Sequence, residues 1–217
     1  MSLKKTVIKT PTYRNRTAYH GMLVGAAAML ASALLVMGNV STKDVIALRL
    51  AEDVQAMLSE VIPSNFHDNN LLDNKITVKN KEVYQALLDN DVSAVAFQVA
   101  EPGYSGVITL IMGVNTKGEV LGVRVVSHTE TPGLGDKMET ARSDWIYNFD
   151  NLALTEANNA DWGVTKDGGT FDQFTGATIT PRAIVKAVKE GMIFFQANKE
   201  TLLSLPVEQP EVTTDGQ

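Results

Sequence analysis

Residues 106–127 read GVITLIMGVNTKGEVLGVRVVS and contain two apolar runs on either side of a polar turn. The runs, 106–114 and 119–127, are rich in Val, Ile and Leu, which favour strands. Residues 115–118, NTKG, have the composition of a tight turn, so we predict an antiparallel β-hairpin. A further strand is predicted over residues 93–99, where the hydrophobic period is also two.

The strongest helix signal of the domain covers residues 180–197. Thr180 suits the N-cap of this helix, and Pro181 suits its first position, where a missing N–H costs nothing. Apolar side chains recur along it at helical spacing. The residues expected on its buried face are Ile184, Val188, Met192 and Phe195.

Other segments complete the predicted fold class. We expect a helix from Ser41 or Thr42 to about residue 58, a break at 62–65, a loop over 68–73, a short helix over 81–88 and a turn over 89–91. The secondary structure of residues 144–149 and of the region near Trp162 is not predicted. These elements predict an α+β fold, in which an N-terminal transmembrane helix precedes a domain with a twisted antiparallel sheet and packed helices.

Residues 21–40, GMLVGAAAMLASALLVMGNV, contain no charged residue. Twenty residues at the helical rise span roughly 30 Å, the thickness of a bilayer's hydrocarbon core. A cleaved secretory signal is the alternative, since residues 31–33, ASA, resemble a cleavage site. The apolar run continues to Met37, beyond a typical signal core, so we predict an uncleaved anchor whose small residues suit packing on another membrane helix.

The charge of the chain is unevenly distributed. Residues 1–20 contain five basic residues and no acidic residue. By the positive-inside rule this end stays in the cytoplasm, and the domain from about residue 42 lies outside, which is the periplasm if the cell is Gram-negative. The net charge is −6 for the whole chain and therefore −11 beyond residue 20. An acidic domain argues against a nucleic-acid partner.

The 217 residues include no cysteine and three histidines that are far apart. Disulfides, iron–sulfur clusters and thioether-linked haem therefore lack their usual thiols, and no metal site is predicted. The HExxH pattern is absent, so hydrolytic catalysis has no support and no catalytic residue is predicted. Electron transfer by this chain would need an organic cofactor.

Residues 172–178, DQFTGAT, lie directly before the strongest predicted helix. The start of a helix has free N–H groups and a partial positive charge, which attract phosphate. Gly176 and Ala177 let the backbone approach a ligand, and Thr175, Thr178 and Thr180 supply hydroxyl groups. From spacing alone, a capped turn without a ligand is the simpler interpretation.

Residues 128–137, HTETPGLGDK, follow the second strand of the hairpin. The Pro-Gly pair forces a turn, and the following glycine keeps the backbone open. Composition alone favours an ordinary surface loop, and a structural role for His128. In the alternative interpretation the loop contacts the polar edge and the face of a ring. The candidate contacts are Glu130, Thr131, Leu134 and Gly135.

Taken together, HTETPGLGD at 128–136 and DQFTGAT at 172–178 resemble the FMN-binding domain of RnfG proteins (also called RsxG). These are the G subunits of the Rnf ion-translocating electron transport complex. NqrC, the C subunit of the sodium-pumping NADH:quinone reductase, shares the domain. The resemblance covers about residues 5–200, and the modest chain length resembles RnfG more than the usually longer NqrC.

The resemblance implies that FMN is attached covalently by a phosphoester to the last threonine of the D-x-x-[ST]-G-A-T pattern, which here is Thr178. A separate flavin transferase, using FAD and a magnesium ion, would install it. This agrees with the local chemistry, because a threonine hydroxyl needs a base to become a good nucleophile and no histidine is near in sequence. The implied recognition residues are Asp172, Thr175, Gly176 and Ala177, and the implied flavin contacts are Glu130, Thr131, Leu134 and Gly135.

The resemblance further implies an inner-membrane electron-transfer subunit of a complex that couples ferredoxin–NAD redox chemistry to ion translocation. The chain would be one redox subunit of a translocase, not active alone, with other Rnf subunits, the transferase and membrane lipid as partners. A related complex keeps a redox-sensing regulator reduced, and the sequence does not separate these roles. NqrC is the alternative within the class. A flavin-free anchored interaction module, in which residues 175–178 only cap a helix, is the alternative outside it.

The expected organisation has four parts. They are a basic cytoplasmic segment at 1–20, a transmembrane helix at 21–40, a periplasmic FMN-binding domain at 42–200 and a flexible tail at 201–217.

Overall fold

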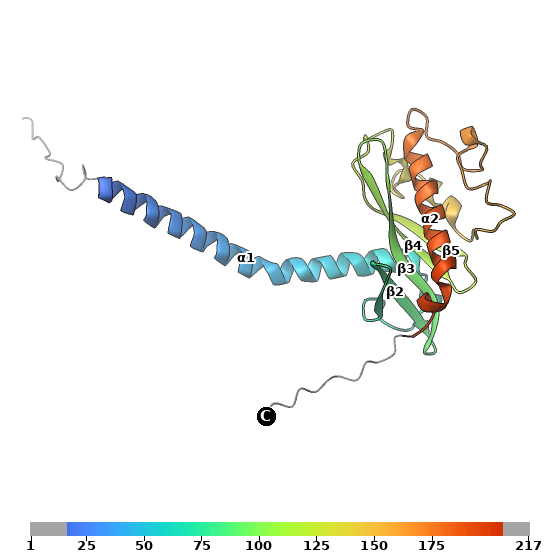
Figure 1. Ribbon diagram of the computed structural model, residues 1–217, viewed down its shortest axis with the longest axis horizontal. Coiled ribbons are helices and arrows are strands. Elements are labelled where there is room, and N and C mark those ends of the chain that lie inside the picture. The colour runs from blue at the N-terminus through green and yellow to red at the C-terminus, as the bar shows by residue number, and fades with distance from the viewer. Residues whose placement is uncertain (1–16, 206–217) are drawn as a thin grey trace, which may run out of the picture. The chain divides into compact units, whose positions relative to one another are not determined.

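The computed structural model describes residues 17–205 (Figure 1). The chain divides into two units, Met1–Ala51 and Glu52–Gln217. Most of the predicted basic segment and of the predicted tail lies outside the described residues. The elements in order are α1 (Thr17–Val61), η2 (Ser64–Phe66), β1 (Lys75–Val78), β2 (Lys81–Leu88), β3 (Asp91–Pro102), β4 (Val107–Asn115), β5 (Val120–Ser127), η3 (Asp136–Met138), η4 (Trp145–Phe149), η5 (Thr165–Asp167) and α2 (Ile179–Leu202).

The first unit contains a candidate membrane span. Thr17–Lys43 has a mean hydropathy of 2.0 in its most apolar window, none of which is buried. It is the one helix among residues 17–205 that is long and apolar enough to cross a membrane. It includes the predicted span at 21–40, and a continuous exposed apolar surface of this length is suited to lipid.

The predicted helix start at Ser41 or Thr42 is wrong, because α1 continues through both positions. The Thr42 hydroxyl donates to the Gly38 carbonyl at 2.8 Å, one turn earlier, and so does not cap a new helix. The helix ends at Val61, two residues before Pro63, which confirms the predicted break.

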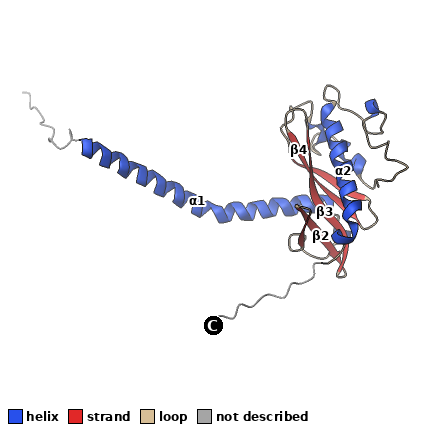
Figure 2. Ribbon diagram, in the orientation of Figure 1, coloured by secondary structure: helices blue, strands red, loops and turns tan. Residues whose placement is uncertain are grey.

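Five antiparallel strands form one open sheet in the order β1-β2-β3-β4-β5. Figure 2 shows the strands in red. The strands predicted around the NTKG turn are confirmed as β4 and β5, and the strand predicted at 93–99 is confirmed as the longer β3. The sheet and the helices packed on it make the predicted α+β fold.

The predicted helix over 81–88 is wrong, because this segment is strand β2. Residues 79–80 before it and 89–90 after it all have positive φ, as tight two-residue hairpin turns require. β2 therefore pairs with β1 on one side and with β3 on the other. Pairing on both edges outweighs the helix propensity of its Glu, Gln, Ala and Leu residues. The predicted turn at 89–91 is confirmed, and β1 was not predicted.

Each face of the sheet is covered by a different helix. α2 lies along β3 and β4 on one face (Figure 2), where Phe97 and Val99 of β3 belong to the main core. On the other face, Ala94 and Ala96 of the same strand pack with Leu58 from the end of α1. Successive side chains of a strand point to opposite faces, so β3 presents large residues to α2 and alanines to α1.

The helix predicted over 180–197 is confirmed as α2, with different ends. Thr178 is its N-cap, Ile179 its first residue and Leu202 its last. The predicted N-cap, Thr180, lies inside the first turn, where its buried hydroxyl donates to Glu130 and Thr180 does not occupy the N-cap position. The expected apolar face is buried throughout: Ile184, Val188, Met192 and Phe195.

A cluster of buried aromatic rings supports the chain before α2. Phe149 stacks on Phe171 with 4.5 Å between ring centroids, and Trp145 meets Phe174 edge-on at 4.9 Å. The segment 144–149, whose structure the sequence did not predict, contains the 3-10 helix η4 (Trp145–Phe149), and its Trp145 and Phe149 belong to this cluster.

Asp150 is a partly buried carboxylate whose burial disfavours its charged form. One of its carboxylate oxygens, Oδ1, is buried and has no hydrogen-bond partner among the described residues. Burial raises the pKa of Asp150 above its ordinary value of 3.8, and the nearby positive charge of Arg124 partly opposes this. The folded state therefore holds the proton more tightly than the unfolded chain, and stability falls as pH rises from 3.8 through the raised value.

Replacing Asp150 by asparagine is expected to stabilise the protein at neutral pH, because the amide has the same shape without the buried charge. We expect Tm to rise by roughly 1–3 °C at about pH 7, and the difference to shrink towards zero at about pH 2.5, where the wild-type carboxyl is largely protonated in both states. Thermal unfolding of the full chain in detergent at both pH values measures this. A difference that does not depend on pH would contradict the electrostatic explanation.

Candidate functional site

Residues 172–178 form a tight turn that leads directly into α2. The Ala177 N–H donates to the Phe174 carbonyl at 3.1 Å, and Gly176, in the third position of the turn, has a φ of 85°. A type II turn requires a positive φ at this position, which glycine adopts without strain. The glycine of the motif is therefore explained by the backbone conformation of the turn.

Buried aromatic side chains hold this turn in place. The Trp145 indole N–H donates to the Asp172 carbonyl at 2.8 Å, and Phe174 is buried against the same indole ring. The segment is thereby fixed at its start and its middle, while Asp172 and Thr175 remain exposed.

Thr178 occupies the N-cap of α2 and is half-buried. Its side chain makes no capping hydrogen bond, so its hydroxyl is not engaged in holding the helix start. The first N–H groups of α2 belong to Ile179 and Thr180, since Pro181 has none. These unpaired donors and the helix dipole make the position next to Thr178 favourable for a phosphate.

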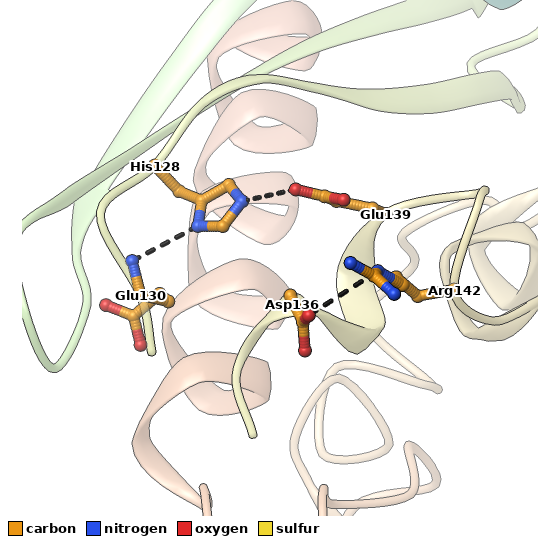
Figure 3. A network of polar contacts seen from close by, with 5 residues as sticks. All are labelled: His128, Glu130, Asp136, Glu139 and Arg142. Carbon is orange, nitrogen blue, oxygen red and sulfur yellow. Dashed lines mark hydrogen bonds and ion pairs between the residues drawn. The ribbon is translucent and has the colours of Figure 1, made fainter. Parts of the chain in front are cut away.

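The loop after β5 is held by His128 (Figure 3). Its Nδ1 accepts from the Glu130 N–H at 3.1 Å, and its Nε2 lies 2.7 Å from Glu139 Oε1. Because Nδ1 accepts, Nε2 is the nitrogen that donates. Further along, the N–H groups of Leu134 and Gly135 both donate to the Thr131 carbonyl, at 3.1 and 3.0 Å. His128 thus has the structural role that its position indicated.

These two segments, far apart in sequence, line one pocket of about 310 Å³. The loop between β3 and β4 supplies the third wall. Polar and apolar groups both line the pocket, and Glu130 is the one charged side chain among the described lining residues. The lining residues are Tyr104, Glu130, Thr131, Leu134, Gly135, Gly176, Ala177, Thr178, Ile179 and Thr180.

The pocket brings together most of the site residues that the sequence predicted. Asp172 and Thr175 are outside its lining, on the exposed side of the turn. The recognition role that the resemblance implies for these two residues stays a prediction. The predicted residues inside the lining are Glu130, Thr131, Leu134, Gly135, Gly176, Ala177 and Thr178.

Sequence reasoning missed Tyr104 and Ile179 as site residues. Tyr104 is 72% exposed and Ile179 is 44% exposed, although both border the pocket. An exposed aromatic residue between Gly103 and Gly106, in a loop joining two strands, is the signal that could have identified Tyr104. Ile179 had no such signal, because its neighbours predict a helix start whether or not a ligand binds.

Part of the chain matches a known protein family. Residues 103–192 match the FMN-binding domain family, and this range contains all three walls of the pocket. The chain also resembles the crystal structure of Shewanella oneidensis NqrC, with a TM-score of 0.46 and 21% identity over 65% of this chain and 73% of that one.

Two relatives, each named as the G subunit of an ion-translocating oxidoreductase complex, extend the match to nearly the whole chain. The protein of Haemophilus influenzae (strain PittEE) is 42% identical over 199 residues, which are 88% of this chain and 96% of the relative. That of Shewanella piezotolerans is 42% identical over 197 residues, which are 86% and 93%. The chain belongs to the family of ion-translocating oxidoreductase complex G subunits, which confirms the resemblance to RnfG.

Proposed function

We propose that this chain is the electron-transfer subunit of a membrane-bound ion-translocating oxidoreductase complex and holds FMN in the pocket beside Thr178. The observation that carries the proposal is the meeting of the 128–136 loop and the 172–178 turn in one pocket at the start of a helix. The name of the relatives and the matching FMN-binding family support the same function. Other subunits of the complex are the expected partners.

The residues present fit FMN. The start of α2 offers N–H donors to a phosphate, and the side chains of Leu134, Ile179 and Tyr104 offer apolar surface to an isoalloxazine ring. FMN, when bound, supplies one- and two-electron chemistry that no side chain of this chain provides. The protein's own part is to bind the ring, orient it and limit its contact with water.

We propose further that the attachment is a phosphoester on Thr178. Its Oγ1 attacks the flavin-side phosphorus of FAD, the bond from that phosphorus to the bridging oxygen breaks, and AMP leaves. The hydroxyl proton passes to a base of a separate flavin transferase, with a magnesium ion on the phosphates. Within residues 17–205, the carboxylate of the pocket is already bonded to Thr180, so an external base is the consistent source of activation.

Flavin fluorescence of the chain on a denaturing gel tests the cofactor and its linkage. We expect a fluorescent band when the full chain is coexpressed with a flavin transferase, and none without the transferase. A flavin that co-purifies but leaves on denaturation would support FMN and contradict the covalent bond. A chain with no flavin at all would favour the anchored module without a cofactor.

We propose that the candidate span at 17–43 anchors the chain in the bacterial inner membrane once, with the domain in the periplasm. Five basic residues at 1–20 support this orientation, and the acidic domain is suited to a protein partner rather than a nucleic acid. A covalent flavin cannot diffuse away from a domain in this compartment. We propose that the parent complex couples ferredoxin–NAD redox chemistry to ion translocation.

The orientation has its own expected result. A reporter enzyme that is active only in the periplasm, fused after residue 217, should be active, and one that is active only in the cytoplasm should be inactive. Moving the positive charges of residues 4–16 to the other end of the span is the control, and should reduce the periplasmic signal. Activity of the cytoplasmic reporter on the unaltered chain would contradict the proposed topology.

A further inference from the structure

Glu130 is a buried carboxylate that bonds to two other segments of the chain. Its side chain is almost fully buried, with 5% of the residue exposed. Oε1 accepts from the N–H groups of Tyr104 and Ser105 at 2.9 and 2.8 Å. Oε2 accepts from the Thr180 hydroxyl. Both oxygens that could have met a ligand are therefore already bonded within the protein.

These bonds join the three walls of the pocket. Tyr104 and Ser105 belong to the loop between β3 and β4, Glu130 to the loop after β5, and Thr180 to the first turn of α2. The partners lie 26, 25 and 50 positions from Glu130 along the chain. One side chain thus links three walls of the pocket that are far apart in the sequence.

The surroundings of Glu130 leave it little freedom to move. A Cβ at Gly103 would lie 2.7 Å from its Oε1, and a Cβ at Gly135 would lie 2.7 Å from its own Cβ. A side chain at either position would collide with Glu130, and at Gly103 it would collide with Ile108 as well. The backbone of Glu130 is fixed as well, through its N–H bond to His128.

We propose that Glu130 is a positioning residue of the flavin site, which acts through Tyr104 and Thr180 and does not itself contact the flavin. The inference rests on the proposed FMN pocket for its function. By bonding to Thr180, Glu130 orients the first turn of α2. Thr178, the N-cap of this helix, lies two residues before Thr180. By holding the N–H groups of residues 104–105, it keeps the exposed Tyr104 at the edge of the pocket.

Four variants separate this role from direct contact. Glu130→Ala removes all three bonds. Glu130→Gln can keep them, because its amide oxygen accepts from both N–H groups and its amide N–H₂ donates to the Thr180 hydroxyl. Thr180→Val removes one bond and leaves the carboxylate, and Thr180→Ser is its matched control. The full chain in detergent is used throughout, made with and without the flavin transferase.

Hydrogen exchange of the Tyr104 and Ser105 amides is the first measurement. We expect exchange about ten- to hundredfold faster in Glu130→Ala, as loss of bonds to a charged acceptor implies, and within about threefold of wild type in Glu130→Gln. Thr180→Val should be intermediate and Thr180→Ser unchanged. This measurement does not need the flavin, so it decides the positioning role even if the covalent linkage proves wrong. Unchanged exchange in both Glu130→Ala and Thr180→Val overturns the inference.

The fluorescence anisotropy of the attached flavin is the second measurement. We expect a more mobile ring in Glu130→Ala and Thr180→Val, and wild-type anisotropy in Glu130→Gln and Thr180→Ser. If Glu130 instead bound the ring directly through its charge, Glu130→Gln would resemble the alanine variant and Thr180→Val would resemble wild type. That pattern would overturn the positioning role while leaving the proposed flavin site intact.

Discussion

Replacing Thr178 by valine is expected to reduce the flavin band on a denaturing gel to background. Valine has nearly the shape of threonine and lacks only the hydroxyl, which is the atom proposed to carry the phosphoester. The Thr178 side chain makes no capping bond to α2, so the helix start should survive the change. Wild type and variant are coexpressed with the transferase and compared at equal protein load.

Matched variants make this result specific. Thr178→Ser keeps a hydroxyl and should keep the band, whereas Thr178→Ala should lose it. Thr175→Ala removes an exposed hydroxyl outside the pocket and should weaken the band without abolishing it, since Thr175 is proposed to help the transferase recognise the chain. A fluorescent Thr178→Val band would locate the flavin on another residue.

Replacing Gly113 by alanine is expected to cause a larger loss of stability than the same change at the other strand glycine, Gly122, where the nearest atom to a Cβ would be 3.1 Å away. A Cβ at Gly113 would lie 2.2 Å from the Val61 carbonyl oxygen and 2.9 Å from its carbon. These are backbone atoms at the end of α1, so no side-chain rotation can relieve the clash. The helix end must move away from β4, which opens the core around Leu58 and Ile111.

We expect a destabilisation of about 3 kcal/mol or more, which corresponds to a fall in Tm of roughly 6–12 °C for a domain of this size. Thermal unfolding of the full chain in detergent measures it. Gly163→Ala is the control, since a Cβ there would approach no atom closer than 3.7 Å, and its effect should stay within about 0.5 kcal/mol. A Gly113→Ala protein as stable as wild type would show that α1 does not pack on this strand.

Several elements could be predicted because their causes are local. The NTKG turn, the apolar run in α1 and the apolar stripe of α2 each depend on residues within a few positions of one another. The two motifs likewise marked the turn and the loop that line the pocket. Sequence reasoning failed at residues 81–88 and at Thr42, where local propensity indicated a helix and a helix start but pairing or helix continuation prevailed.

The sequence by itself determined the membrane-span candidate, the central hairpin, the long C-terminal helix and the threonine proposed to carry FMN. Only the tertiary structure decided that β2 is a strand, that Gly113 must have no side chain, and that Glu130 bonds to protein groups. Each of these depends on atoms that meet across long separations, such as the 50 positions between Glu130 and Thr180. A local sequence pattern does not predict such a contact, because the two groups meet only after the sheet and its two helices have packed.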